Sequence, residues 1–130
     1  MKAAFSLLEI IIGILIIGLI SSFAIPKLMD TKDFANATTL KRDIFSIISS
    51  AQSYNLTSPE TFNINNAIEI NDNIWTVDSE GNLTDKTQCV KISFNTDEIT
   101  VSQQTETSLV CDKLFKTIFK EDETSKTFIL

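Results

Sequence analysis

Apolar residues fill the first part of the chain almost without interruption. From residue 5 to residue 25 the sequence reads FSLLEIIIGILIIGLISSFAI, and Glu9 is its only charged residue. As a helix, these twenty-one residues would rise about 31 Å, which matches a bilayer hydrocarbon thickness of roughly 30 Å. Isoleucine favours strands in water, but in lipid the backbone must bond within its own segment. We therefore predict a membrane-spanning helix.

After Pro26 the pattern changes to that of an amphipathic helix. Apolar residues recur at steps of three or four, as on one helical face; they are Phe34, Ala37, Leu40, Ile44, Ile47, Ala51 and Tyr54. No glycine interrupts residues 27–54, and the segment NLTSP, ending at Pro59, is a stop signal. We predict one helix from residue 5 to residue 54 with Pro26 as a kink, the alternative being a helix that ends at Pro26.

The rest of the chain predicts a loop and a small antiparallel sheet. Residues 55–73 are weakly patterned, and a loop anchored by isoleucines is expected, with at most a short strand or helical turn. Alternation and short apolar runs predict strands at 74–77, 83–84, 90–94, 99–101 and 109–111, with a turn at 78–82. Helical spacing predicts a helix over 112–120 capped by Asp112, with a strand as the alternative. The expected fold is α+β, with the helix packed on three to five strands.

The composition favours a structural or binding protein over an enzyme. Of 11 basic and 17 acidic residues, Lys2 and Glu9 alone precede residue 27, so the remainder has a net charge of −6, which argues against direct nucleic-acid binding. The chain lacks histidine, so no Ser-His or Cys-His pair and no His-containing zinc site can form. No catalytic residue, cofactor or metal site is predicted. Calcium at Glu121-Asp122-Glu123 is an alternative, although adjacent carboxylates lack the alternating ligand pattern.

Glu9 separates three interpretations of the amino-terminal segment. A secretory signal ending at Ser22-Phe23-Ala24 would release a periplasmic binding or adaptor module after Ala24. An uncut anchor would hold the same module at the membrane. Neither of these uses a carboxylate whose insertion costs roughly 2.5–3.5 kcal/mol. A charge within a membrane segment instead indicates a function that involves an oppositely charged partner.

The residues Ala4-Phe5-Ser6-Leu7-Leu8-Glu9, followed by the apolar run, resemble the type III signal of bacterial type IV pilins and type II secretion pseudopilins. The resemblance covers roughly the first fifty residues, and the rest of the chain is too variable in this family to match. It implies a leader of residues 1–4, cleavage by prepilin peptidase between Ala4 and Phe5, and N-methylation of Phe5. It also makes Glu9 the acidic assembly residue and Pro26 the helix-kinking proline. The family's usual residue before the cut is glycine, so cleavage after Ala4 is expected to be slower.

The physical logic of Glu9 agrees with the resemblance. Cleavage before Phe5 creates a cation four residues from Glu9, and opposite charges in a low-dielectric medium attract strongly. The amine of an incoming subunit can pair with Glu9 of a subunit already in a fibre and so fix the axial register. The alternative is a pair within one helix, between the Phe5 amine and Glu9.

The resemblance also implies a function and its partners. The chain would be a pilin-like structural subunit of a type IV pilus, a competence pseudopilus for DNA uptake, or a type II secretion pseudopilus. It would span the bacterial inner membrane once, with its carboxy-terminal domain in the periplasm, before it joins a fibre. Its partners would be prepilin peptidase, other pilin or pseudopilin subunits, and an assembly platform protein with its ATPase. The parts are then the leader 1–4, the transmembrane half 5–26, the amphipathic half 27–54 and the periplasmic domain 55–130.

Two features of the carboxy-terminal region bear on export. Cys89 and Cys111 are a candidate disulfide because exported chains retain disulfides, and the resemblance implies such a bridge late in the chain; the alternative is two buried thiols. The alternation of residues 90–94 predicts that Cys89 faces outward. The segment from Glu80 to Thr84 resembles the extended acceptor pattern for bacterial periplasmic N-glycosylation at Asn82, with an ordinary hairpin turn as the alternative.

Overall fold

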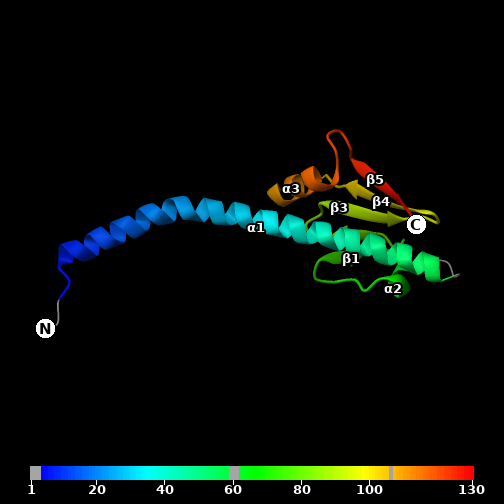
Figure 1. Ribbon diagram of the computed structural model, residues 1–130, viewed down its shortest axis with the longest axis horizontal. Helices are drawn as coiled ribbons and strands as arrows, with labels where there is room; N and C mark the ends of the chain where they lie inside the picture. Colours follow the sequence, from blue (N-terminus) through cyan, green and yellow to red (C-terminus); the bar gives the residue numbers. More distant parts are fainter. Residues whose placement is uncertain (1–3, 59–61, 106) are drawn as a thin grey trace. The chain divides into compact units, whose positions relative to one another are not determined.

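The computed structural model describes residues 4–58, 62–105 and 107–130, and it has the predicted α+β architecture. The chain divides into two compact units, Met1–Asp33 and Phe34–Leu130. The first unit holds the beginning of the long helix. The second holds the remainder of that helix together with the sheet and two further helices (Figure 1). The predicted leader residues 1–3 and the predicted stop residue Pro59 lie outside the described residues.

Helix α1 spans Leu7–Thr57 and contains Pro26, so the alternative in which the helix ends at this proline is wrong. A proline removes one backbone hydrogen bond, and the helical segments on both sides are long enough to outweigh that loss. The helix begins two residues later and ends three residues later than predicted. Its last turn is closed by the Ser58 N–H, which donates to the Tyr54 carbonyl at 2.9 Å.

The five strands form one antiparallel sheet in chain order, β1-β2-β3-β4-β5. The strands are β1 Trp75–Val77, β2 Leu83–Asp85, β3 Val90–Phe94, β4 Glu98–Gln103 and β5 Ser125–Ile129. The register pairs Val77 with Leu83 and Phe94 with Ile99. The turn between β1 and β2 lies at 78–82 as predicted, and Gly81 adopts a φ of 82°, which a glycine accommodates without strain.

Helix α3, Leu109–Ile118, begins earlier than predicted, and the strand expected at 109–111 is wrong. The cap is Ser108 rather than Asp112: the Ser108 hydroxyl oxygen accepts from the Cys111 N–H at 3.2 Å. Asp112 lies in the first turn instead and pairs with Lys116 at 2.9 Å across one helical turn. Ser108 followed by a short apolar run is compatible with either a strand or the start of a helix. The hydrogen bond between the Ser108 hydroxyl and the Cys111 N–H favours the helix.

Strand β5 was not predicted from the sequence. Its inward positions are Lys126 and Phe128, whereas the apolar Ile129 is 78% exposed, so the usual alternation of apolar and polar residues is obscured. The short helix α2, Ile64–Ala67, lies within residues 55–73, for which a loop with at most a short strand or a helical turn was expected. Its cap is Asn63, whose side-chain oxygen accepts from the Asn65 N–H at 3.0 Å.

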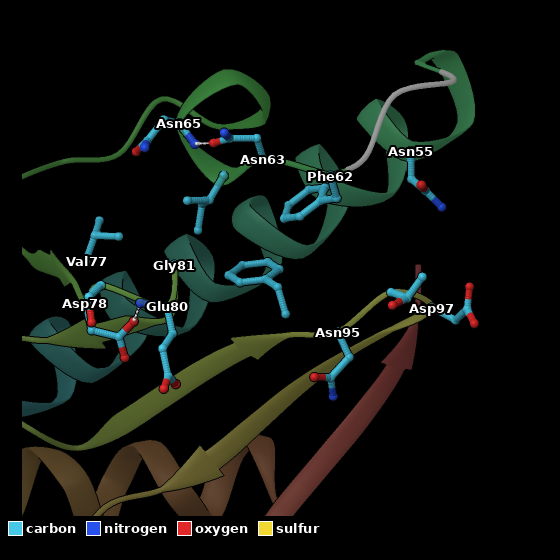
Figure 2. A pocket seen from close by; sticks show the side chains of 14 residues that line it. Asn55, Phe62, Asn63, Asn65, Val77, Asp78, Glu80, Gly81, Asn95 and Asp97 are labelled. Carbon is cyan, nitrogen blue, oxygen red and sulfur yellow. Dashed lines mark hydrogen bonds between the residues drawn. The ribbon is translucent and has the colours of Figure 1, made fainter.

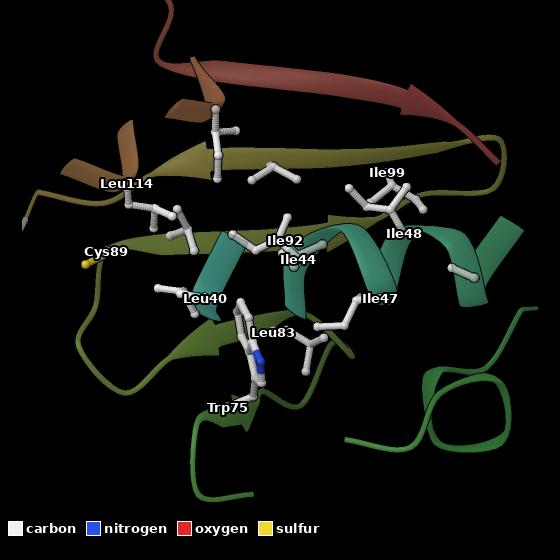
Figure 3. Close-up of a cluster of buried hydrophobic side chains, with 14 of the residues drawn as sticks. Leu40, Ile44, Ile47, Ile48, Trp75, Leu83, Cys89, Ile92, Ile99 and Leu114 are labelled. Carbon is white, nitrogen blue, oxygen red and sulfur yellow. The ribbon is translucent and has the colours of Figure 1, made fainter. Parts of the chain in front are cut away.

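The core lies between the second half of α1 and the sheet (Figure 3). Ile44 is fully buried in this layer, facing sheet residues such as Ile92 and Leu83, which are also fully buried. The predicted stripe is largely confirmed, since Ala37, Leu40, Ile44, Ile47 and Ala51 are buried. Two members of the stripe depart from this pattern: Phe34 is 58% exposed and Tyr54 is half-buried, whereas Ile48, which was outside the stripe, is buried. The core therefore begins one helical turn later than the sequence pattern indicates.

Candidate functional site

The residues predicted to be processed and to direct assembly lie at the start of α1. Ala4 and Phe5 are both exposed, Phe5 to 77%. Ser6 precedes the first helical residue, and its hydroxyl accepts from the Glu9 N–H at 3.3 Å. In return, the Ser6 N–H donates to Glu9 Oε2 at 3.4 Å. This reciprocal pair is a capping box, which places the Glu9 carboxylate at the positive end of the helix dipole.

Ser6 was missed as a functional residue, although the signal for it was present. The motif Ser-x-x-Glu before an apolar run is the sequence signature of a capping box. Glu9 thus has a local structural role in the chain as it stands, in addition to any role in assembly. Its predicted pairing with the Phe5 amine of a neighbouring subunit, and the alternative pairing with the Phe5 amine of its own chain, concern the cleaved chain and stay predictions.

The apolar side chains of the first unit are exposed around the whole helix. Phe23 is 80% exposed and Ile14 is 66% exposed, as are most of their neighbours between residues 7 and 29. Gly13 and Gly18 have open space where a Cβ would stand: apart from their two chain neighbours and the nearby backbone of their own helix, no described atom lies within 4 Å. An all-round apolar helix requires a partner outside the chain, either lipid or other helices. By length and composition this helix could span a membrane.

The hydroxyl groups near Pro26 do not compensate for its missing N–H. Ser21 Oγ donates to the Ile17 carbonyl and Ser22 Oγ donates to the Leu19 carbonyl, each at 2.8 Å. Both bonds run to carbonyls one turn back rather than to the Ser22 carbonyl, which Pro26 leaves without its helical donor. Serine hydroxyls in helices commonly donate to a carbonyl three or four residues earlier, and Ser21 and Ser22 follow this pattern.

The predicted disulfide between Cys89 and Cys111 is present, with a Cα–Cα distance of 5.0 Å. It ties the residue before β3 to the first turn of α3, and both cysteines are fully buried. The expectation that Cys89 faces outward is therefore wrong. Gln88 adopts a positive φ of 55°, which reorients the chain just before β3, so the strand's alternation does not extend back to Cys89.

A buried carboxylate organises the connection that leads to Cys89. Asp85 is 2% exposed at the end of β2. Its Oδ1 accepts from the Val90 N–H at 2.8 Å, and its Oδ2 accepts from the N–H and the hydroxyl of Thr87. These bonds satisfy a carboxylate that would otherwise be costly to bury. They also fix the loop that presents Cys89 to α3.

Asn82 is engaged in a polar network within the β1–β2 turn. It is 8% exposed, and its Nδ2 donates to Asp78 Oδ2 at 3.0 Å and to Glu80 Oε2 at 3.3 Å. The nitrogen that glycosylation would modify is thus buried and bonded in the folded chain. Hydrogen bonds from the side chain and the backbone of Asn82 lower the pKa of Asp78 to about 2.

The acidic turn at 121–123 closes on itself. Glu123 Oε2 accepts from the Lys120 N–H at 3.1 Å, and Asp122 has a positive φ of 74°. Within the described ranges, no group of three or more acidic, histidine or cysteine side chains is arranged to hold a metal ion.

Comparisons of the chain with protein-family models, with curated proteins and with solved structures found no match.

Proposed function

We propose that the chain is a pilin-like structural subunit of a type IV pilus, a competence pseudopilus or a type II secretion pseudopilus. One observation carries the proposal: a single helix begins as an exposed apolar segment headed by Glu9 and continues as the core helix of a folded domain. This arrangement joins a membrane anchor, through one continuous helix, to the domain that it would display. The resemblance of residues 4–9 to a prepilin signal supports the same function.

In this proposal the chain first resides in the bacterial inner membrane, crossing it once, with residues 55–130 in the periplasm. The disulfide between Cys89 and Cys111 agrees with an oxidising compartment. Prepilin peptidase cuts between Ala4 and Phe5 and methylates the new amine. A platform protein and an assembly ATPase then move the subunit into the fibre, where the apolar helices bury one another's exposed faces.

Glu9 would act at two stages of this pathway, before cleavage and during assembly. Before cleavage its carboxylate is held by Ser6 at the helix start. After cleavage a cation stands one residue before Ser6, and the amine of a neighbouring subunit is a stronger partner for a carboxylate in a low-dielectric core than a backbone N–H is. Pairing between subunits would then set the axial stagger of the fibre.

The amino terminus of the native protein tests the proposal directly. Mass spectrometry of protein purified from its own membranes should show a chain that starts at N-methylated Phe5. A start at Ile25 would support the alternative, a released periplasmic binding or adaptor module. A start at Met1 would support an uncut anchor, and either of these results would overturn the proposal.

A further inference from the structure

The end of the folded domain near the last turns of α1 carries an open groove of about 880 Å³. Four parts of the second unit enclose it: the end of α1 at Asn55, the segment 62–65, the β1–β2 turn and the β3–β4 turn (Figure 2). Its volume lies within the range of ligand sites in proteins. Segments far apart in the sequence therefore converge on one concave surface.

The floor of the groove is aromatic. The rings of Phe62 and Phe94 stack with centroids 5.1 Å apart and an interplanar angle of 25°. Tyr54 meets Phe62 edge-on at 6.1 Å and supports it from α1. Phe62 and Phe94 are half-buried, so part of their surface is available to a ligand. Such a floor suits an apolar side chain or the aliphatic stem of a lysine or arginine.

The walls of the groove are acidic and rich in amides. Asp78 and Glu80 lie at one end and Asp97 lies at the other, with Phe62 between them (Figure 2). Of the fourteen described lining residues, none is lysine or arginine. The nearby Lys91 pairs with Asp78 Oδ2 at 3.4 Å and neutralises one of the three carboxylates in part.

Four asparagines complete the walls and add hydrogen-bonding capacity without charge; they are Asn55, Asn63, Asn65 and Asn95. Carboxamides both donate to and accept from peptide backbone. Because hydrogen bonds from Asn82 lower the pKa of Asp78 to about 2, this carboxylate is ionised throughout the physiological range. The groove thus has a fixed negative charge, an aromatic floor and backbone-compatible sides.

We propose that this groove binds a basic polypeptide segment of a partner protein, with lysine or arginine side chains at the acidic ends and an apolar side chain over Phe62 and Phe94. Charge complementarity selects the partner, since a cationic segment gains at both ends of the groove and an acidic one is repelled. The inference concerns the folded domain alone and does not depend on the chain forming a fibre.

The test is a titration of the ¹⁵N-labelled full chain, in micelles of a zwitterionic detergent, with the capped peptide Lys-Ala-Phe-Ala-Lys. We expect saturable amide shifts at Asn63, Gly81 and Asn95, and binding that weakens as salt is raised. The matched peptide Glu-Ala-Phe-Ala-Glu should leave these amides unmoved. An equal response to both peptides, or no response at millimolar concentrations of the lysine peptide, would overturn the proposal. Saturable binding of a neutral oligosaccharide in place of the lysine peptide would also overturn it.

Three variants separate the groove from the general negative charge of the protein. Glu80→Gln and Asp97→Asn should each raise the Kd for the lysine peptide about two- to fivefold, the size expected for exposed charge pairs. Glu121→Gln removes the same charge from an exposed turn outside the groove and should leave the Kd unchanged. Each variant's own amide spectrum reports whether it is folded. A Glu121→Gln effect as large as that of the two groove variants would refute the site.

Discussion

Ser6 and Glu9 bond to each other in both directions across the first turn of α1, so the residue expected to direct assembly also caps its own helix. Glutamine can also accept the hydrogen bond of a capping box, which allows the capping role of Glu9 to be separated from the role of its charge. Glu9→Gln should keep the helical start and membrane insertion but abolish incorporation into fibres, because it lacks the charge that pairs with an amine. Cell fractionation and fibre purification measure this outcome.

Ser6→Ala is the matched control for Glu9→Gln. It removes one half of the cap, at a local cost of about 0.5–2 kcal/mol, and leaves the Glu9 charge in place. The Ser6→Ala subunit should still enter fibres. If Glu9→Gln subunits were incorporated as well as the unaltered chain, the carboxylate would have only its local capping role.

Ile44 and Phe34 test where the core begins along α1. Ile44 is fully buried, whereas Phe34 is 58% exposed, although both belong to the stripe predicted from sequence. Ile44→Ala should lower the free energy of unfolding by about 2–5 kcal/mol because it leaves a cavity. Phe34→Ala should change it by no more than about 0.5 kcal/mol. Trp75, the single tryptophan, is 2% exposed and reports unfolding by fluorescence in denaturant. A similar loss in both variants would contradict the observed boundary.

The bridge between Cys89 and Cys111 should account for a substantial part of the domain's stability. The two cysteines are 22 residues apart, and closing a loop of this size constrains the unfolded chain by roughly 3 kcal/mol on the entropy model. Replacing both cysteines by alanine should lower the free energy of unfolding by about that amount, measured by the same Trp75 fluorescence. A thiol assay in denaturant should detect free thiols only after reduction; thiols detected before reduction would refute the bridge.

Asp78 should make stability depend on pH in the acidic range. Its folded pKa is about 2, against an ordinary value of 3.8, chiefly because of hydrogen bonds from Asn82. Between these values the unfolded state binds more protons than the folded state, so stability falls as the pH falls. The contribution is complete above about pH 4 and is lost as the pH drops through about 2.

Unfolding curves from pH 5 to pH 2 measure the effect of Asp78. Asp78→Asn should flatten the pH dependence in this range. Asn82→Ala, which removes the side-chain donor, should raise the pKa of Asp78 towards its ordinary value, as followed by carboxyl chemical shifts. A pH dependence that is the same in all three proteins would show that Asp78 does not contribute.

Local patterns predicted the elements whose conformation depends on a few adjacent residues. The turn at 78–82 was evident from its turn-forming residues and from Gly81, which tolerates the positive φ that it adopts. In the structure, Asp78 also accepts from the backbone N–H groups of Glu80 and Asn82. The strand at 90–94 followed from its alternation. The long helix followed from residue spacing, and it continued through Pro26 because both flanking segments are strongly helical.

The same patterns failed where contacts between distant residues decide the outcome. β5 pairs with β4, and the Gln52 side chain of α1 donates to the Ile129 carbonyl at 2.6 Å, but neither contact leaves a local signal. The sequence pattern predicted a strand at residues 109–111. In the structure these residues are helical, because the Cys111 N–H donates to the Ser108 hydroxyl and caps the helix. The burial of Cys89 depended on the positive φ at Gln88 and on α3, to which the disulfide joins it.

By itself, the sequence determined the long helix, its apolar first half with a single carboxylate, the α+β class and the two cysteines, because each follows from residue type and spacing along the chain. The tertiary structure alone decided that Asn82 is enclosed, and that two turns and the end of α1 form an acidic groove. These features depend on which atoms meet in space. Periodicity along the chain indicates which residues lie on the buried face of a helix or strand, but it does not specify which residues of other elements pack against that face.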